Sequence, residues 1–448
     1  MKSSSCSRRS ASVGGHELFG EELPELLTVS EGASEPFGGP ITGSFDLASP
    51  ADQERVRQLA DAVLARGAPP YAPGDPSGPL DARIAMHLAE SKAVVQRLDW
   101  DGTLAVVFAM WGEQRRLRPR SDSNPAGEDA LHTKLDQLAW LFEGSRTQWL
   151  VYPVDDGDPD DSAVVAIERA AEHREGGRVS VLRLTDEVPT DTGPLASLGH
   201  VDDSRKGGAI VWGAATAVDE GCDAVVLTDA DNSVNLAQIG LLLGPFRDGH
   251  EVVVGDRKHP DSVLVKAEAR WGPGIVVLRH MQRMVGRALF ASGLRDTQAA
   301  FKLYGRAVLD DILRAPATFG FAFDSDWLYA ALAGGHSIRR VPFAFVDSFA
   351  ESASITQGPM TTWESLLRGL VDAARARGVD HDEEMASVID DFAVAEILDH
   401  VVQRVPPELE SVADDQLGDR GLMTPARLRE WLDGVPRRSP ERTTPFLS

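Results

Sequence analysis

The sequence predicts an α/β protein built on a mostly parallel sheet, and three observations support this class. Short apolar runs alternate with helical patterns through the middle of the chain, as in consecutive βαβ units. The 448 residues are enough for one large domain with additional segments. Hydrophobic residues make up 42% and charged residues 25%, which is typical of a chain that folds around a packed core.

The first hundred residues precede this alternation. Residues 1–49 are rich in Ser, Gly, Glu and Pro without periodicity, and we expect a flexible leader there. Apolar residues at helical spacing predict helices over 50–66 and 80–98, separated by a Pro/Gly-rich linker. We therefore expect a helical appendage over residues 50–100.

The sheet domain is expected over residues 101–378. Its candidate strands are the apolar runs Leu104–Met110, Trp149–Val154, Val179–Leu184, Ala224–Leu227 and Glu251–Val254. Helical patterns lie between them at Ala130–Phe142, Ser162–His173 and Gly207–Glu220. Ligands on parallel sheets bind at the carboxyl ends of strands, so polar residues directly after these runs are candidate site residues. Residues 379–448 turn acidic and then helical, which predicts a C-terminal helical appendage and tail.

The charge balance excludes several classes of partner. The formal net charge is −24, from 45 basic and 69 acidic residues, which argues against binding to nucleic acid or to anionic lipid. No run approaches the roughly 18 apolar residues that span a bilayer, so we expect no transmembrane segment. Cys6 and Cys222 are too few for a disulfide framework, and a reducing cytoplasm fits them best.

Asp155 and Asp156 directly follow the second apolar run, with Gly157 after them. A carboxylate at a strand end can hydrogen-bond a base or a ribose, and glycine lets the backbone turn past it. The alternative is an Asx-rich turn that caps the next helix. Both interpretations stay open from the residues alone.

Asp229 and Asp231 flank Ala230 directly after the fourth apolar run. Residues i and i+2 point the same way on extended backbone, so the two carboxylates can share one Mg²⁺ or Mn²⁺ that in turn binds a diphosphate. Most isolated Asp-x-Asp motifs in acidic chains lie in surface loops. The position of this motif at a strand-to-helix junction favours the metal site.

Six stretches resemble, in order and spacing, family 2 glycosyltransferases of the GT-A fold, most closely the dolichyl- or polyprenyl-phosphate branch. They are VDDGDPDDS (154–162), SRKGGAIVWGAATA (204–217), LTDADNS (227–233), VVVGDR (252–257), RDTQAAFKLYGRAV (295–308) and FAFDSDWLYAAL (321–332). The resemblance implies a GT-A domain, a Rossmann-like sheet flanked by helices, with the helical appendages outside it.

The resemblance also assigns roles to individual positions. The implied nucleotide-sugar-binding residues are Glu113, Asp155, Asp156, Lys206, Gly207, Gly208, Asp229, Ala230, Asp231, Arg257 and Gln298, with Asp229 and Asp231 as the metal pair. Two departures from the family pattern stand out. Asp256 replaces the usual serine before Arg257, and only Glu113 remains of the first P-x-Y-N-E motif, which an insertion over 115–128 lengthens.

Inverting sugar transfer to a hydroxyl needs a carboxylate on the acceptor side, because the hydroxyl must lose its proton. Asp324 resembles the family's acceptor-side aspartate, and we expect it to be the catalytic base. The alternative is that Asp324 and Asp326 cap the helix that follows them. Asp296 is the second candidate catalytic residue, placed to hold sugar hydroxyls with Gln298 beside it.

Together these residues predict a metal-dependent inverting glycosyltransferase with a UDP- or GDP-sugar donor. One alternative is a nucleotidyltransferase, although FAMWGEQ at 108–114 lacks the Gly-rich basic loop of that class. Another is an inactive GT-A module that only binds its ligand.

The acceptor leaves a further choice. The negative net charge and the lack of a spanning segment predict a soluble acceptor. The alternative is a polyprenyl-phosphate glycosyltransferase that docks peripherally on a membrane through Arg279, Arg283 and Arg287, which recur on one helix face. The same face can equally be an ordinary surface whose arginines pair with Glu268 or other acids.

Overall fold

The computed structural model describes residues 45–46, 48–67, 78–265, 272–347 and 359–435. The predicted leader and the last part of the predicted tail therefore lie largely outside the described residues. Within the described ranges, no helix is long and apolar enough to cross a membrane.

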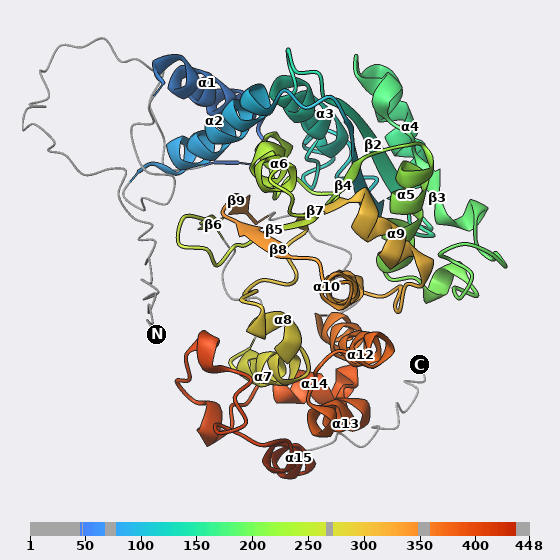
Figure 1. Ribbon diagram of the computed structural model, residues 1–448, viewed down its shortest axis with the longest axis vertical. Helices are drawn as coiled ribbons and strands as arrows, with labels where there is room; N and C mark the ends of the chain where they lie inside the picture. The colour runs from blue at the N-terminus through green and yellow to red at the C-terminus, as the bar shows by residue number, and fades with distance from the viewer. Residues whose placement is uncertain (1–44, 47, 68–77, 266–271, 348–358, 436–448) are drawn as a thin grey trace, which may run out of the picture. The chain divides into compact units, whose positions relative to one another are not determined.

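The fold is built on a seven-stranded sheet with helices on both of its faces (Figure 1). Its strand order is β3-β2-β1-β4-β7-β5-β8. The strands are β1 (Thr103–Met110), β2 (Gln148–Asp155), β3 (Leu182–Arg183), β4 (Ala224–Thr228), β5 (Val252–Gly255), β7 (Phe301–Gly305) and β8 (Ile338–Val341). β7 runs antiparallel to β4 and β5, and the other neighbouring pairs are parallel. The predicted α/β class with a mostly parallel sheet is confirmed.

Helices cover both faces of this sheet, which explains why its strands are continuous apolar runs in the sequence. Residues 104–108 of β1 are all fully buried. Figure 1 shows α5 (Gly207–Asp219) and α9 (Arg306–Arg314) on one face. The other face carries α2 (Leu80–Leu98), α3 (Ala130–Leu141) and α6 (Ile239–Arg247).

The two N-terminal helices have the predicted bounds. α1 (Pro50–Arg66) begins after Ser49, whose side chain accepts a hydrogen bond from the Asp52 amide, and it ends at Gly67 with φ of 71°. α2 packs closely along α6, where the Gly240 amide donates to Ser91 Oγ at 2.8 Å. A Cβ on Gly240 would lie 2.1 Å from the Ser91 carbonyl oxygen, so this helix crossing requires glycine. The helices predicted as an appendage are thus packed onto the sheet domain.

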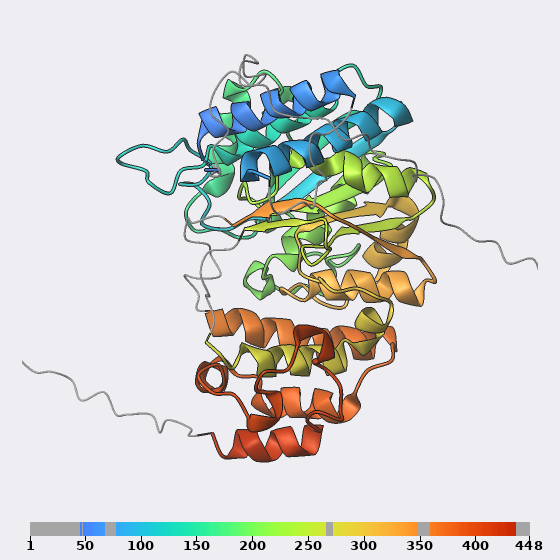
Figure 2. The same cartoon turned by 90° about the vertical axis from the view of Figure 1, so that its left-hand side faces the viewer.

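A second group of helices, three of which lie between strands of the sheet in the chain while the rest follow the last strand, shares a core with the sheet domain. It contains α7 (Ile275–Val285), α8 (Arg287–Ala291), α10 (Phe323–Ala333), α12 (Pro359–Arg377), α13 (Glu383–Phe392), α14 (Ala395–Val401) and α15 (Pro425–Asp433). Figure 2 shows α7 and α12 beside α13 and α14, and buried side chains of these helices join the core under α5. The domain boundary at residue 378 stays a prediction.

The strands of the structure differ from the sequence-based prediction in three places. The strand expected over 179–184 is reduced to β3, because a short helical turn precedes Val179 and another begins at Leu184. β7 was not predicted, because Lys302 interrupts its apolar pattern. A second, two-stranded parallel sheet of β6 (Val263–Val265) and β9 (Ala344–Val346) was also missed. The remaining described helix, α4 (Ser162–Glu172), matches its prediction closely.

Candidate active site

Most of the predicted site residues lie at one edge of the sheet. The parallel strands β1, β2, β4 and β5 end there, followed by Glu113, Asp156, Asp229 and Arg257 respectively. β7 is antiparallel and begins at this same edge, since Phe301 pairs with Thr228, the last residue of β4. The Asp296–Gln298 segment comes directly before β7 in the chain. It therefore lies at the same edge of the sheet as Asp229, which follows β4.

The Asp229 and Asp231 carboxylates are partly exposed at this edge. The Lys206 ammonium forms an ion pair with Asp229. Burial raises the pKa of Asp229, but the Lys206 charge outweighs it and holds the pKa below its usual value. For Asp231, burial and the neighbouring Asp229 charge both raise the pKa. The two carboxylates thus repel each other.

This pair fits a divalent cation by its chemistry. Mg²⁺ and Mn²⁺ prefer hard oxygen ligands, and a cation between two repelling carboxylates relieves their repulsion. Among the described residues, no group of three or more His, Cys, Asp or Glu side chains is placed to hold a metal. A cation at Asp229 and Asp231 would therefore take its other ligands from water or from a substrate diphosphate.

The turn at Lys206–Gly208 is shaped by close packing. Lys206 has φ of 74°, a left-handed conformation, directly before α5. A Cβ on Gly207 would lie 2.5 Å from the backbone carbon of Phe319, and a Cβ on Gly208 would lie 2.6 Å from Ser204 Oγ. Both glycines therefore have a structural reason to be present, and a contact with the donor stays a prediction.

Asp155 and Asp156 have different surroundings. Asp155 Oδ1 accepts from the amides of Gly157 and Asp158 at 3.0 and 2.9 Å, which is the Asx-turn arrangement weighed above. Asp156 instead binds Ser204 Oγ and the Lys206 amide, the latter at 2.7 Å. Burial raises the pKa of Asp156 to about 6. Asp156 thus braces the Lys206 turn, and nucleoside contacts for both aspartates stay predictions.

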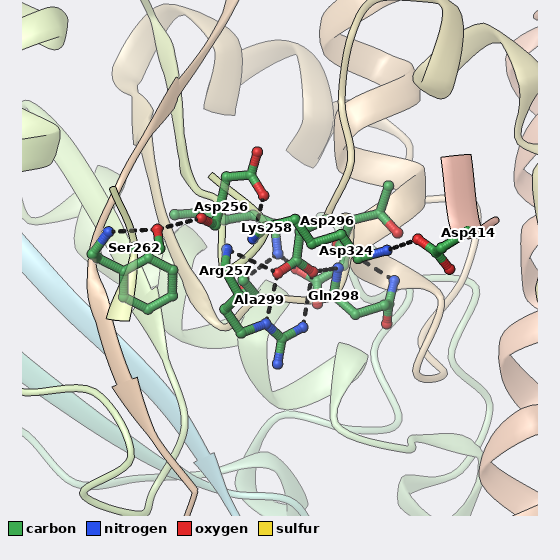
Figure 3. A network of polar contacts seen from close by, with 12 residues as sticks. Asp256, Arg257, Lys258, Ser262, Asp296, Gln298, Ala299, Asp324 and Asp414 are labelled. Atoms are coloured by element: carbon green, nitrogen blue, oxygen red, sulfur yellow. Dashed lines mark hydrogen bonds and ion pairs between the residues drawn. The ribbon is translucent and has the colours of Figure 1, made fainter. Parts of the chain in front are cut away.

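Arg257 and Asp296 form a two-pronged ion pair, with Nε to Oδ2 at 2.6 Å and Nη2 to Oδ1 at 2.8 Å (Figure 3). Although burial raises the pKa of Asp296, the hydrogen bonds and charge of Arg257 lower it to about 2. The neighbouring Asp256, which replaces the family's serine, is buried and accepts from Arg340 Nη1 at 2.9 Å. The aspartate at this position therefore links the end of β5 to β8 through a side-chain ion pair.

Asp324 is held by a lysine that the sequence analysis did not single out. Lys302 is fully buried, and its Nζ donates to Asp324 Oδ1 at 2.7 Å and to the Ala299 carbonyl. α10 begins at Phe323, and no side chain caps it. The capping interpretation of Asp324 is therefore wrong. Lys302 lies in the FKL part of the RDTQAAFKL stretch, which is where a sequence signal for it existed.

Gln298 and Glu113 lie in different surroundings. Gln298 Nε2 lies 3.4 Å from the Oγ of Ser325, the residue after Asp324. The backbone N–H of Gln298 donates to Asp296 Oδ1 at 3.3 Å (Figure 3). Glu113 is buried and forms an ion pair with Arg116. Burial raises the pKa of Glu113 to about 7. Glu113 thus contacts a residue of the insertion, and its predicted contact with the nucleotide stays untested.

The arginines of the predicted membrane-facing stripe are paired with acids. Asp414 binds Arg283 at 2.6 Å and Arg279 at 3.5 Å. It also binds Lys258 at 2.7 Å, as Figure 3 shows. Arg287 pairs with Asp380. For Arg279 and Arg287 these contacts match the interpretation of an ordinary acid-paired surface, with partners other than Glu268, which lies outside the described residues. Arg283 is buried and therefore does not lie on that surface.

Comparison with known proteins identifies relatives in sequence. Over 232 residues the chain is 28% identical to the polyprenol monophosphomannose synthase of Mycolicibacterium smegmatis, covering 50% of this chain and 78% of the relative. Over 179 residues it is 28% identical to the undecaprenyl-phosphate mannosyltransferase of Micrococcus luteus, covering 37% of this chain and 72% of the relative. No protein-family model matches the chain.

Solved structures with a related chain path include two sugar-phosphoglycerate synthases. For glucosyl-3-phosphoglycerate synthase from Mycobacterium tuberculosis, solved with Mn²⁺ and UDP-glucose, the TM-score is 0.40 at 15% identity, over 66% of this chain and 84% of that one. For mannosyl-3-phosphoglycerate synthase from Rubrobacter xylanophilus the TM-score is 0.43 at 16% identity, over 64% of this chain and 78% of that one.

The sequence relatives confirm the resemblance to the polyprenyl-phosphate branch of family 2 glycosyltransferases. Together with the mostly parallel sheet flanked by helices, they confirm the prediction of a glycosyltransferase of the GT-A class.

Proposed function

We propose that this glycosyltransferase moves a sugar from a UDP- or GDP-sugar to an acceptor with inversion, and that it depends on Mg²⁺ or Mn²⁺. The observation that carries the proposal is the gathering of Asp229, Arg257 and Asp324 at one sheet edge. Burial lowers the pKa of Arg257, but the ion pair with Asp296 and the nearby charges of Asp229 and Asp324 together raise it above its usual value. A metal pair, a phosphate-binding cation and an acceptor-side carboxylate are the groups that such a transfer needs.

Each group has a distinct part in the proposed reaction. Asp229 and Asp231 would hold the cation, which neutralises charge on the leaving diphosphate when bound. Arg257, fixed by Asp296, presents its guanidinium to the donor phosphates. Asp324 takes the proton from an acceptor hydroxyl, and the buried Lys302 orients its carboxylate. Glu113, Asp155 and Asp156 are proposed to lie on the nucleoside side.

Release of nucleoside diphosphate from UDP- and GDP-sugars, with and without Mn²⁺, tests the proposal. We expect turnover with one of the two nucleotides that rises with Mn²⁺ and falls to background with EDTA. A nucleotidyltransferase would release pyrophosphate from a nucleoside triphosphate and a sugar phosphate instead. An inactive module would bind the donor without turnover, and either result would contradict the proposal.

The acceptor is proposed to be soluble, and the location cytoplasmic, as expected from the charge and the cysteine content. The names of the two sequence relatives favour the alternative, because both refer to polyprenyl phosphates. In this structure, however, Arg279, Arg283 and Arg287 are paired with Asp414 and Asp380, so they do not form a free cationic surface.

Flotation with anionic liposomes separates these two acceptors. Because the three arginines are neutralised by acids, we expect the protein to stay in the soluble fraction at physiological salt. Robust co-migration with the liposomes, lost when the three arginines are changed to glutamate, would instead support the lipid-phosphate acceptor. Exchange of the exposed Arg118 for glutamate serves as the control for a simple change of net charge.

A further inference from the structure

We propose that the insertion over residues 115–128 positions the metal site, with Glu128 as the positioning residue that fixes the Asp229–Asp231 loop. The inference rests on the proposed function, because it assumes that this loop binds a divalent cation. It concerns a part of the chain that lengthens the first loop of the sheet domain and that the proposed reaction leaves without a role.

Glu128 forms two hydrogen bonds with Asn232, the residue directly after the metal pair. Its Oε2 accepts from the Asn232 amide at 2.9 Å, and its backbone carbonyl accepts from Asn232 Nδ2 at 3.0 Å. Only 3% of the Glu128 side chain is exposed. The hydrogen bond from the Asn232 amide to this carboxylate is therefore shielded from water, which strengthens it.

The insertion itself is built to hold Glu128 in place. Arg116 Nε donates to Glu128 Oε1 at 3.2 Å, and the Glu128 amide donates to the Arg116 carbonyl at 3.1 Å. Inside the loop, Asn124 Nδ2 bonds the carbonyls of Arg115 and Pro119 at 2.8 and 3.0 Å. A Cβ on Gly127 would lie 2.4 Å from the Pro119 oxygen, so the loop closes tightly on itself.

A second anchor reaches the same loop from α3. Lys134 is fully buried, and its Nζ donates to the backbone carbonyl of Asp231. Lys134 and Glu128 thus bind consecutive backbone groups, the carbonyl of Asp231 and the amide of Asn232. Both residues fix the turn through its main chain. Neither of these contacts uses the Asp231 carboxylate, which keeps its oxygens available for a cation. Outer groups that orient metal ligands in this way typically contribute about 10-fold to 100-fold in metal affinity.

The test compares Mn²⁺ binding by the full-length wild type and a Glu128→Ala variant, measured by electron paramagnetic resonance in the presence of UDP. We expect the variant to bind Mn²⁺ at least about 10-fold more weakly. The Mn²⁺ concentration for half-maximal turnover should rise by a similar factor, whereas kcat at saturating Mn²⁺ should recover. Glu430→Ala, at an exposed ion pair with Arg427 on α15, is the matched control and should leave both values unchanged.

Other outcomes have distinct meanings. A folded Glu128→Ala variant with wild-type Mn²⁺ affinity overturns the inference, and so does a loss of kcat that saturating Mn²⁺ does not restore. If Glu128→Ala does not fold, Glu128→Gln keeps an acceptor for the Asn232 amide and should show a smaller weakening, and no weakening there contradicts the inference. A wild-type protein that binds no Mn²⁺ with UDP contradicts the proposed function itself.

Discussion

An Asp231→Asn variant is expected to lose sugar transfer by at least about 100-fold in kcat while remaining folded. The removed charge stabilises a bound cation and, with it, the leaving diphosphate, and such a contribution amounts to several kcal/mol. Folding should be preserved because Lys134 binds the main-chain carbonyl of residue 231. In the wild type the Ser233 amide donates to Asp231 Oδ1 at 3.0 Å, and the Oδ1 of an asparagine can accept the same hydrogen bond.

The measurement is kcat as a function of Mn²⁺ concentration, with melting temperature as the check on folding. Asp202→Asn is a suitable control, because that carboxylate is 79% exposed and pairs with His200. Undiminished turnover with unchanged Mn²⁺ dependence in Asp231→Asn would remove Asp231 from the metal site.

Asp324→Asn is expected to lower kcat by about 100-fold with a hydroxyl acceptor, with little change in donor affinity. The structure adds a second effect to this variant. Lys302 is fully buried, so the loss of the Asp324 charge leaves an unpaired ammonium in the core. Breaking a buried ion pair by removing one partner costs about 3–5 kcal/mol, and we therefore expect a lower melting temperature as well.

The double variant Lys302→Met/Asp324→Asn separates the two effects. Replacing a buried pair by groups without charge is often nearly neutral, so the melting temperature should recover. The kcat should stay low if Asp324 is the base. Recovery of kcat together with stability would leave Asp324 with a structural role only. A folded Asp324→Asn variant with a mild loss of kcat would point to a phosphate acceptor, which is already an anion and needs no base.

The strands and helices that could be predicted from the sequence are those whose environment is uniform along the element. β1 is apolar throughout because both faces of the sheet are covered, and α1 has a Ser49 cap and a Gly67 stop. β7 was missed because its second residue, Lys302, is buried through a contact with Asp324, which lies on another element. Single-sequence periodicity carries no information about such a partner.

The candidate site follows the same rule. Asp229 and Asp231 could be found because the sheet rule and the motif both indicate strand ends. Glu128 and Lys134 could not, because their contacts with Asn232 and Asp231 join segments about a hundred positions apart in the chain. Asp155 shows the opposite case. Its residue type allowed a turn or a ligand contact, and the structure supplies the hydrogen bonds of the turn.

The ion pair of Arg257 with Asp296 also joins two points of the chain that are far apart in sequence. The chain leaves the sheet after β5 at Arg257 and returns to it before β7 at Asp296, and the two departure points are joined by paired hydrogen bonds. The excursion between them, which carries α7 and α8, is therefore closed at its base. Buried residues of α7 and α8 share one core with the sheet and α5, so substitutions in this excursion act on the sheet domain through packing as well as through the ion pair.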